Sequence, residues 1–237
     1  MKQKKKILLI VSAILLVAIV VTSIYVFAVV IPNKKEEERK QQMVKEYYQN
    51  KLNLYKQENE EYDDYEVDVA FLGDSLTDGY DLKKYYPEYL TSNRGIGGET
   101  TIGLEKRLDV SVYDLKPKVV VMLIGGNNLY NMFDNYEDIL IGLKENLPDS
   151  KVVLLSLTAM GRDWGHKNEI ACLNNVKIKL LAQKYNFEFV DLFTPLFDLS
   201  VNELYKEYSN DGAHFTHLGY EVVTSKITPV LEELLGR

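Results

Sequence analysis

The residues from Ile7 to Ile31 form an almost uninterrupted apolar run, and this run most constrains how the chain can fold. Its only mildly polar members are Ser12, Thr22, Ser23 and Tyr25. A helix rises about 1.5 Å per residue, so a helix of this length crosses a hydrocarbon core of about 30 Å. We therefore expect a transmembrane anchor over residues 7–31, which leaves only the rest of the chain for a globular domain.

The charges that flank this run predict its orientation. Lysines precede it without any acid, whereas basic and acidic residues mix after it, from Lys34 to Lys40. Positive charge close to a membrane favours the cytoplasmic side. We expect a cytoplasmic basic segment at residues 1–6 and an extracellular location for the domain that follows the anchor.

A cleaved signal peptide is the alternative interpretation of the same run. Its apolar region usually spans about 7–15 residues and ends at a small-residue cleavage site. The run is longer, and its end from Phe27 to Pro32 contains no clear A-x-A pattern. These features favour an uncleaved anchor.

Charge and cysteine content exclude several function classes. The chain has a formal net charge of −7, and residues 67–237 contain 17 basic and 25 acidic side chains. Nucleic acid is therefore not an expected partner, because neutralisation of phosphates supplies most of that affinity. Cys172 is the only cysteine, so neither an internal disulfide nor a zinc site built on several cysteines can form. We expect Cys172 to be a packing residue in a helix.

The residues after the anchor separate into a charged segment and a patterned domain. Residues 32–66 are expected to form a stalk or linker, with some helical spacing and an irregular acidic end at 58–66. From Val67 short apolar runs alternate with amphipathic stretches. Strands are expected at 67–72, 91–94, 118–124, 151–157 and 187–191, and helices near 100–108, 136–146, 168–185 and 216–235. This alternation predicts an α/β domain over 67–237, a three-layer α/β/α sandwich around a five-stranded parallel sheet.

Three glycine-containing motifs follow three of the expected strands. They are Gly73-Asp74-Ser75, Asn93-Arg94-Gly95-Ile96-Gly97-Gly98-Glu99-Thr100-Thr101 and Gly125-Gly126-Asn127. Ligands of open parallel sheets bind beyond the carboxyl ends of the strands. We therefore expect one site at this edge, completed by Asp211-Gly212-Ala213-His214 near the last helix.

These four segments resemble the SGNH, or GDSL-type, hydrolase superfamily of serine esterases and lipases, whose fold is flavodoxin-like. The second segment is most similar to the platelet-activating-factor acetylhydrolase-type branch. The resemblance covers about residues 67–237. It departs from the family pattern at Glu99, where Asp is more common, and at Asn128, where Asp usually follows the Asn.

The resemblance implies a role for each matched residue. Ser75 is the nucleophile, His214 the base and Asp211 the carboxylate that orients the base. The backbone N–H groups of Ser75 and Gly98 and the Asn127 amide form the oxyanion hole. Singly, each residue also has a structural interpretation, such as a helix cap, a turn former or a surface histidine.

Other residues near the expected site carry weaker signals. Trp164 and His166 lie in the loop after the fourth strand, where Trp164 could stack on a sugar ring or simply be on an ordinary surface loop. Arg94 could contact an anionic substrate or be solvated at the surface. His217 is expected to be structural. No cofactor and no metal are expected.

The sequence thus predicts a membrane-anchored extracytoplasmic serine esterase that hydrolyses short-chain or acetyl esters of cell-surface glycans or lipids. Two alternatives remain open: an O-acyltransferase that uses the same triad on a glycan acceptor, and a non-catalytic surface binding module.

Overall fold

The computed structural model describes residues 2–237. It divides the chain into two compact units, of which the first ends at Asn50 and the second is Lys51–Arg237. The first residue of the expected basic segment at 1–6 lies outside the described residues.

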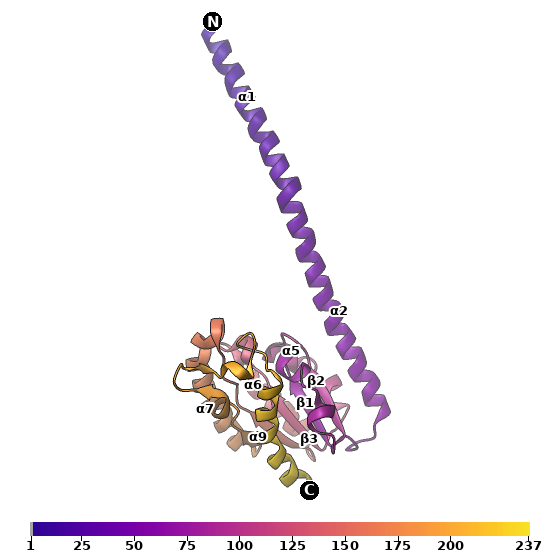
Figure 1. Cartoon of the computed structure of the whole chain (residues 1–237). Coiled ribbons are helices and arrows are strands. Elements are labelled where there is room, and N and C mark those ends of the chain that lie inside the picture. The colour runs from indigo at the N-terminus through magenta and orange to yellow at the C-terminus, as the bar shows by residue number, and fades with distance from the viewer. Residues whose placement is uncertain (1) are drawn as a thin grey trace. The chain divides into compact units, whose positions relative to one another are not determined.

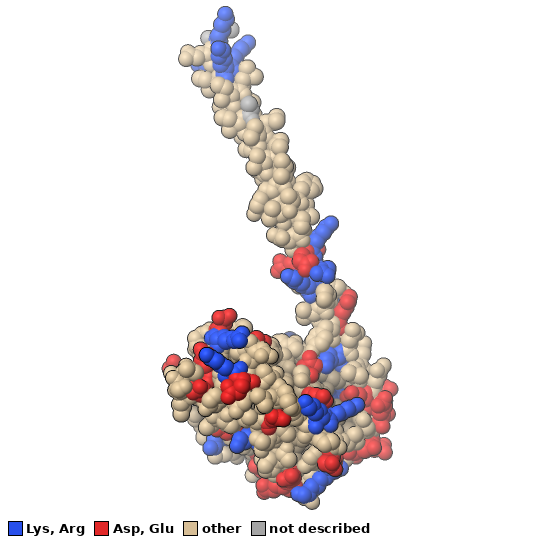
Figure 2. All heavy atoms as spheres, in the orientation of Figure 1, with Lys and Arg blue, Asp and Glu red and all other residues tan. Residues whose placement is uncertain are grey.

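The N-terminal unit is helical throughout (Figure 1). It contains α1 (Lys2–Tyr25), the π-helical turn η1 (Val26–Val30) and most of α2 (Ile31–Glu61). Lysines gather at its start and a stretch without charged side chains follows (Figure 2). Apolar side chains of this stretch are exposed, for example Leu9 at 70% and Phe27 at 72%. By length and composition the helix can cross a membrane, a property that it shares with signal sequences.

The second unit is built on a five-stranded sheet in the order β2-β1-β3-β4-β5. All four pairings are parallel, and the strands are β1 (Val69–Gly73), β2 (Thr91–Gly95), β3 (Val119–Leu123), β4 (Lys151–Leu155) and β5 (Glu188–Val190). The predicted α/β fold with a five-stranded parallel sheet is confirmed. Every residue of β3 is buried, which explains why this central strand is apolar on both faces.

The strand register aligns the ends of β1, β2 and β3. Gly73 pairs with Gly95 on one side and with Leu123 on the other, and these three residues are the last of their strands. The loops that follow β1, β2 and β3 therefore leave the sheet at one edge, as the motif positions predicted.

Helices and short turns connect the strands. They are α3 (Ser75–Asp78), α4 (Leu82–Tyr85), α5 (Thr101–Glu105), η2 (Asp109–Tyr113), η3 (Gly126–Asn128), η4 (Met132–Asp134), α6 (Tyr136–Asn146), η5 (Arg162–Lys167), α7 (Asn168–Tyr185), α8 (Phe193–Leu196), η6 (Lys206–Tyr208) and α9 (His217–Leu235). A two-stranded antiparallel hairpin pairs β6 (Phe197–Asp198) with β7 (Glu203–Leu204).

The helices form two layers. Helices α5, α6 and α7 follow one another in contact, as right-handed crossovers between β2, β3, β4 and β5 require. The chain passes from β1 to β2 in the opposite direction across the sheet, which places α3 and α4 on the other face. There Tyr80 stacks on Tyr220 of α9, with ring centroids 4.7 Å apart.

The second unit begins before the predicted boundary at residue 67. The last turns of α2 belong to it, because Tyr55 is fully buried and its hydroxyl donates a 2.6 Å hydrogen bond to the carbonyl of Gly95. The helix continues to Glu61, so the expected irregular linker at 58–66 is wrong over its first four residues. Cys172 lies in a helix, α7, as expected, but its side chain is exposed, so the expected packing role is wrong.

Candidate active site

Ser75 is the first residue of α3, which begins two residues after the end of β1. Asp74 is the N-cap of this short helix, and its carboxylate accepts a 3.1 Å hydrogen bond from the backbone N–H of Leu76. Gly73 has to be glycine here, because a Cβ would lie 2.3 Å from the carbonyl oxygen of Leu123. The tight turn presents Ser75 at the edge of the sheet where the three loops emerge.

His214 reaches Ser75 from the loop before α9. Its Nε2 lies 3.0 Å from the Ser75 Oγ, and its Nδ1 lies 2.7 Å from Asp211 Oδ2. Because Asp211 is an acceptor, Nδ1 carries the proton and Nε2 is free to accept one from the serine hydroxyl. The structure therefore brings the predicted nucleophile, base and carboxylate into one hydrogen-bonded chain.

The Asp211 loop is fixed by its own hydrogen bonds. Asp211 Oδ1 accepts from the backbone N–H groups of Ala213 and His214 at 2.9 and 2.8 Å. Partial burial raises the pKa of Asp211, but the hydrogen bonds from His214 and Ala213 outweigh it and hold the pKa below its ordinary value. The residue thus stays ionised beside the imidazole at any pH near neutrality.

Gly98 and Asn127 lie on the loops after β2 and β3. Gly98 is exposed and has a φ of 76°, and a Cβ there would meet no atom within 4 Å. Glycine is thus needed for its backbone conformation and not for space. Asn127 Nδ2 donates to the carbonyl of Glu99 at 2.9 Å and makes a longer contact of 3.4 Å with Asp74 Oδ2. The Asn127 amide is therefore tied to the same loop that carries Gly98.

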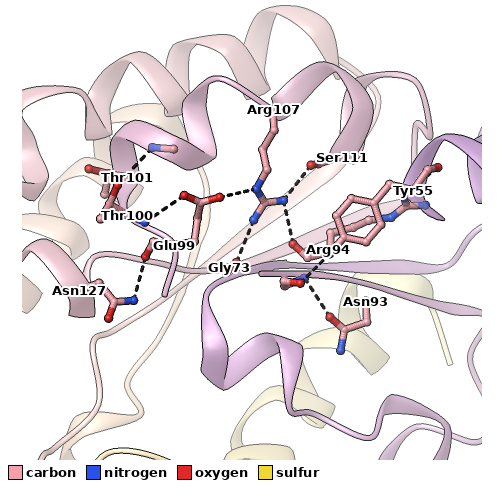
Figure 3. A network of polar contacts seen from close by, with 12 residues as sticks. Tyr55, Gly73, Asn93, Arg94, Glu99, Thr100, Thr101, Arg107, Ser111 and Asn127 are labelled. Carbon is pink, nitrogen blue, oxygen red and sulfur yellow. Dashed lines mark hydrogen bonds and ion pairs between the residues drawn. The ribbon is translucent and has the colours of Figure 1, made fainter. Parts of the chain in front are cut away.

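A buried ion pair braces this loop from behind (Figure 3). Arg107 Nε donates to Glu99 Oε2 at 3.0 Å, and both residues are buried, at 2% and 7% exposure. The same guanidinium donates to the carbonyls of Gly73 and Arg94 at 2.9 and 3.0 Å. One side chain therefore joins the ends of β1 and β2 to the loop of Gly98. The sequence carried no sign of it, because an arginine after a helix usually lies at the surface.

Arg94 is neither a contact residue of the candidate active site nor a solvated surface residue, which were the two interpretations from the sequence. It is fully buried and contacts neither solvent nor the Ser75 site. Its guanidinium pairs with Glu58 at 3.1 Å and donates to the carbonyl of Tyr55 at 3.1 Å. It also lies against the Tyr55 ring (Figure 3). Both partners belong to the end of α2, so a residue of the glycine-rich motif serves to dock this helix on the domain.

A cavity of about 280 Å³ opens beside Ser75 and His214. Apolar side chains form most of its wall, which includes Leu76, Leu123, Asn127, Leu157, Met160, Trp164 and Lys167. Its size is at the low end for a small-molecule site. The arrangement can therefore hold a small ester with its carbonyl against the serine.

A model of the GDSL-like Lipase/Acylhydrolase family matches residues 71–222. The chain belongs to this family. The predicted identification is confirmed, and the chain is an esterase-type acylhydrolase.

Several family members and related structures resemble it. The platelet-activating factor acetylhydrolase IB subunit alpha2 of Rattus norvegicus is 33% identical over 186 residues, which span 73% of this chain and 79% of the relative. A solved Streptococcus pneumonia protein whose description names platelet activating factor superposes with a TM-score of 0.74 at 24% identity, over 84% of this chain and 99% of its own. An acetylxylan esterase from Geobacillus stearothermophilus gives a TM-score of 0.58 at 21% identity, over 71% and 95%. The two structures share the fold of the GDSL-like domain.

The two residues that depart from the family pattern, Glu99 and Asn128, form hydrogen bonds that hold the loops after β2 and β3. Glu99 anchors Arg107, as described above. Asn128 Nδ2 donates to the Thr101 hydroxyl at 2.9 Å, which joins the loops after β2 and β3. The remaining histidines are away from Ser75: His166 lies by a separate hollow beside Cys172, and His217 pairs with Glu221 at 3.0 Å.

Proposed function

We propose that this GDSL-like acylhydrolase is a membrane-anchored esterase that removes acetyl or other short acyl groups from cell-surface glycans or lipids outside the cell. The observation that carries the proposal is the chain of contacts from Ser75 through His214 to Asp211, at 3.0 and 2.7 Å. A free serine hydroxyl is too weak a nucleophile to attack an ester, so it needs this base.

In the proposed mechanism the Ser75 oxygen attacks the ester carbonyl while His214 Nε2 takes its proton. Asp211 holds the imidazole in the required tautomer and stabilises the imidazolium. His214 then gives the proton to the departing alcohol oxygen. Water attacks the acyl-serine with the same base, which releases the acid and restores Ser75.

The negative charge that develops on the carbonyl oxygen needs donors. The proposed donors are the backbone N–H groups of Ser75 and Gly98 and the amide of Asn127. One Asn127 N–H is used by the Glu99 carbonyl, which fixes the amide plane. The other makes only the long contact with Asp74, so it is the one available to the substrate oxygen.

Two observations support a short acyl group. The cavity of about 280 Å³ is at the low end for a small-molecule site, which suits a small acyl group. Two of the similar proteins are named for acetyl esters, an acetylhydrolase subunit and an acetylxylan esterase. The anchor is supported by the apolar helix and the lysines before it.

A series of p-nitrophenyl esters of increasing acyl length tests the proposal. We expect the acetate to be cleaved fastest and Ser75→Ala to lose at least about three orders of magnitude in kcat/KM. Asn127→Ala is expected to lose about a hundredfold or more, since one oxyanion donor is removed. Equal rates for wild type and Ser75→Ala would remove the proposed nucleophile. Acyl transfer to an added sugar in preference to water would instead identify an acyltransferase, and no turnover together with no fluorophosphonate labelling would favour a binding module.

A further inference from the structure

The cavity beside Ser75 has one lysine in its wall. Its other ionisable lining residues are Asp74, which is only 4% exposed, and the proposed base His214. Lys167, at the end of η5, is half-buried. A cation in a mostly apolar wall is costly to hold without a partner, which raises the question of what it meets there.

Lys167 is held at the wall by an aromatic ring. Its ammonium nitrogen lies 4.3 Å from the centroid of Trp164, a distance at which the ring face attracts a cation. Among residues 2–237, no carboxylate lies within ion-pair distance of this ammonium. The charge is therefore positioned but not neutralised by the protein.

The segment that carries Trp164 and Lys167 is fixed at both ends. At its start the Gly161 N–H donates to the carbonyl of Gly212 at 2.8 Å. At its end the buried Asn168 accepts from the N–H of Met160 at 2.8 Å and donates to the Met160 carbonyl at 2.7 Å. Such hydrogen bonds make η5 a preorganised wall and not a loose surface loop.

The hydrogen bond between Gly161 and Gly212 indicates which part of the substrate η5 faces. Gly212 lies between Asp211 and His214, so η5 stands on the imidazole side of the site. His214 must protonate the departing alcohol oxygen, whereas the oxyanion donors are on the other loops. The alcohol portion of the ester therefore lies against the part of the cavity wall that contains Lys167.

From this geometry we propose that the site prefers esters whose alcohol portion carries an anionic group, a carboxylate or a phosphate, and that Lys167 binds that group. The proposal rests on the proposed esterase function and names its substrate class. An ammonium that is already held in place forms a charge-assisted hydrogen bond with an anion at little further ordering cost.

The test uses the full chain in a neutral detergent and two acetyl esters that differ in one charge. The substrates are 4-acetoxybenzoate and its uncharged methyl ester, and the readout is kcat/KM for each. We expect Lys167→Met to lower kcat/KM for the anionic ester about tenfold and to leave the neutral ester within about twofold. Lys167→Arg should keep most of the preference. Lys226→Met, which removes an exposed lysine of α9 away from the cavity, is the matched control and should change neither substrate.

Each outcome decides the matter. A loss confined to the anionic ester and restored by arginine supports the subsite. An equal loss on both esters, no loss on either, or the same loss in Lys226→Met overturns it while the esterase function stands. If wild type cleaves neither ester faster than Ser75→Ala, the proposed function itself fails and the subsite falls with it.

Discussion

At the residue scale, Asp74 is the most unusual ionisable group of the site. It lies next to the nucleophile, is buried, and has no lysine or arginine within ion-pair distance among residues 2–237. Burial raises its pKa to about 6, although the hydrogen bond from Leu76 and the nearby His214 act in the opposite direction. The carboxylate therefore ionises inside the protein only at a higher pH than in the unfolded chain.

This shift predicts a pH-dependent stability. Between about pH 4 and 6 the folded chain binds more protons than the unfolded chain at Asp74, so its contribution to stability is lost as pH rises through about 6. The full effect of the shift is on the order of 3 kcal/mol. We expect Asp74→Asn to flatten the free energy of unfolding between pH 4 and 6, measured by urea denaturation of residues 51–237.

The Asp211 contribution serves as an internal reference for this measurement. Its pKa is lowered, so its stabilisation is present above about pH 4 and lost below it, in a separate window. An unchanged slope between pH 4 and 6 in Asp74→Asn would show that another group titrates there.

At the element scale, the end of α2 packs on the globular unit and pairs with its charged residues. Tyr55 is buried against Gly95, Glu58 and the Tyr55 carbonyl hold the Arg94 guanidinium, and Lys51 pairs with Asp78. These partners are in β2 or, for Asp78, at the end of α3. Without this helix, Arg94 of edge strand β2 would lose the carboxylate of Glu58 and the Tyr55 ring that covers it.

Two truncated chains test this role. A fragment that starts at Lys51 is expected to fold and to hydrolyse p-nitrophenyl acetate like the full chain. A fragment that starts at Val67 leaves Arg94 uncompensated and uncovers the Tyr55 site, which we expect to cost about 3–5 kcal/mol of stability. Thermal unfolding of the two fragments gives the comparison. Equal melting temperatures would mean that α2 adds nothing to the domain.

At the scale of the whole molecule, the proposed location of the activity depends on the apolar helix. Residues 7–12 and 14–30 expose only apolar or mildly polar side chains, which is unfavourable in water over such a length. The proposed anchor keeps the esterase at the membrane and so restricts it to esters close to the surface.

Membrane fractionation tests the proposed location of the full chain. The full chain should stay with the membrane fraction after washing with alkaline carbonate, and a protease added outside intact cells should remove the GDSL-like domain. A chain lacking residues 1–31 and expressed without export should be soluble and active. Recovery of a shortened mature protein in the medium would show that the apolar run is a cleaved signal.

The sequence alone determined the fold class and the residues that meet at the site. Alternating apolar and amphipathic runs have periods that the backbone imposes locally, so α6 and α7 were predicted with their observed limits. The positions of Ser75 and Asn127 followed from motifs at strand ends, where parallel topology brings loops together. The place of His214 followed from the family resemblance of the segment before the last helix.

Only the tertiary structure decided the roles of residues whose partners are distant along the chain. Arg94 and Arg107 are both buried: Arg94 docks the end of α2 through Glu58, and Arg107 holds the loop of Gly98 through Glu99. Lys167 became a candidate for substrate binding only when the fold placed η5 beside His214. Burial and charge pairing depend on which elements meet, and local sequence patterns do not encode that.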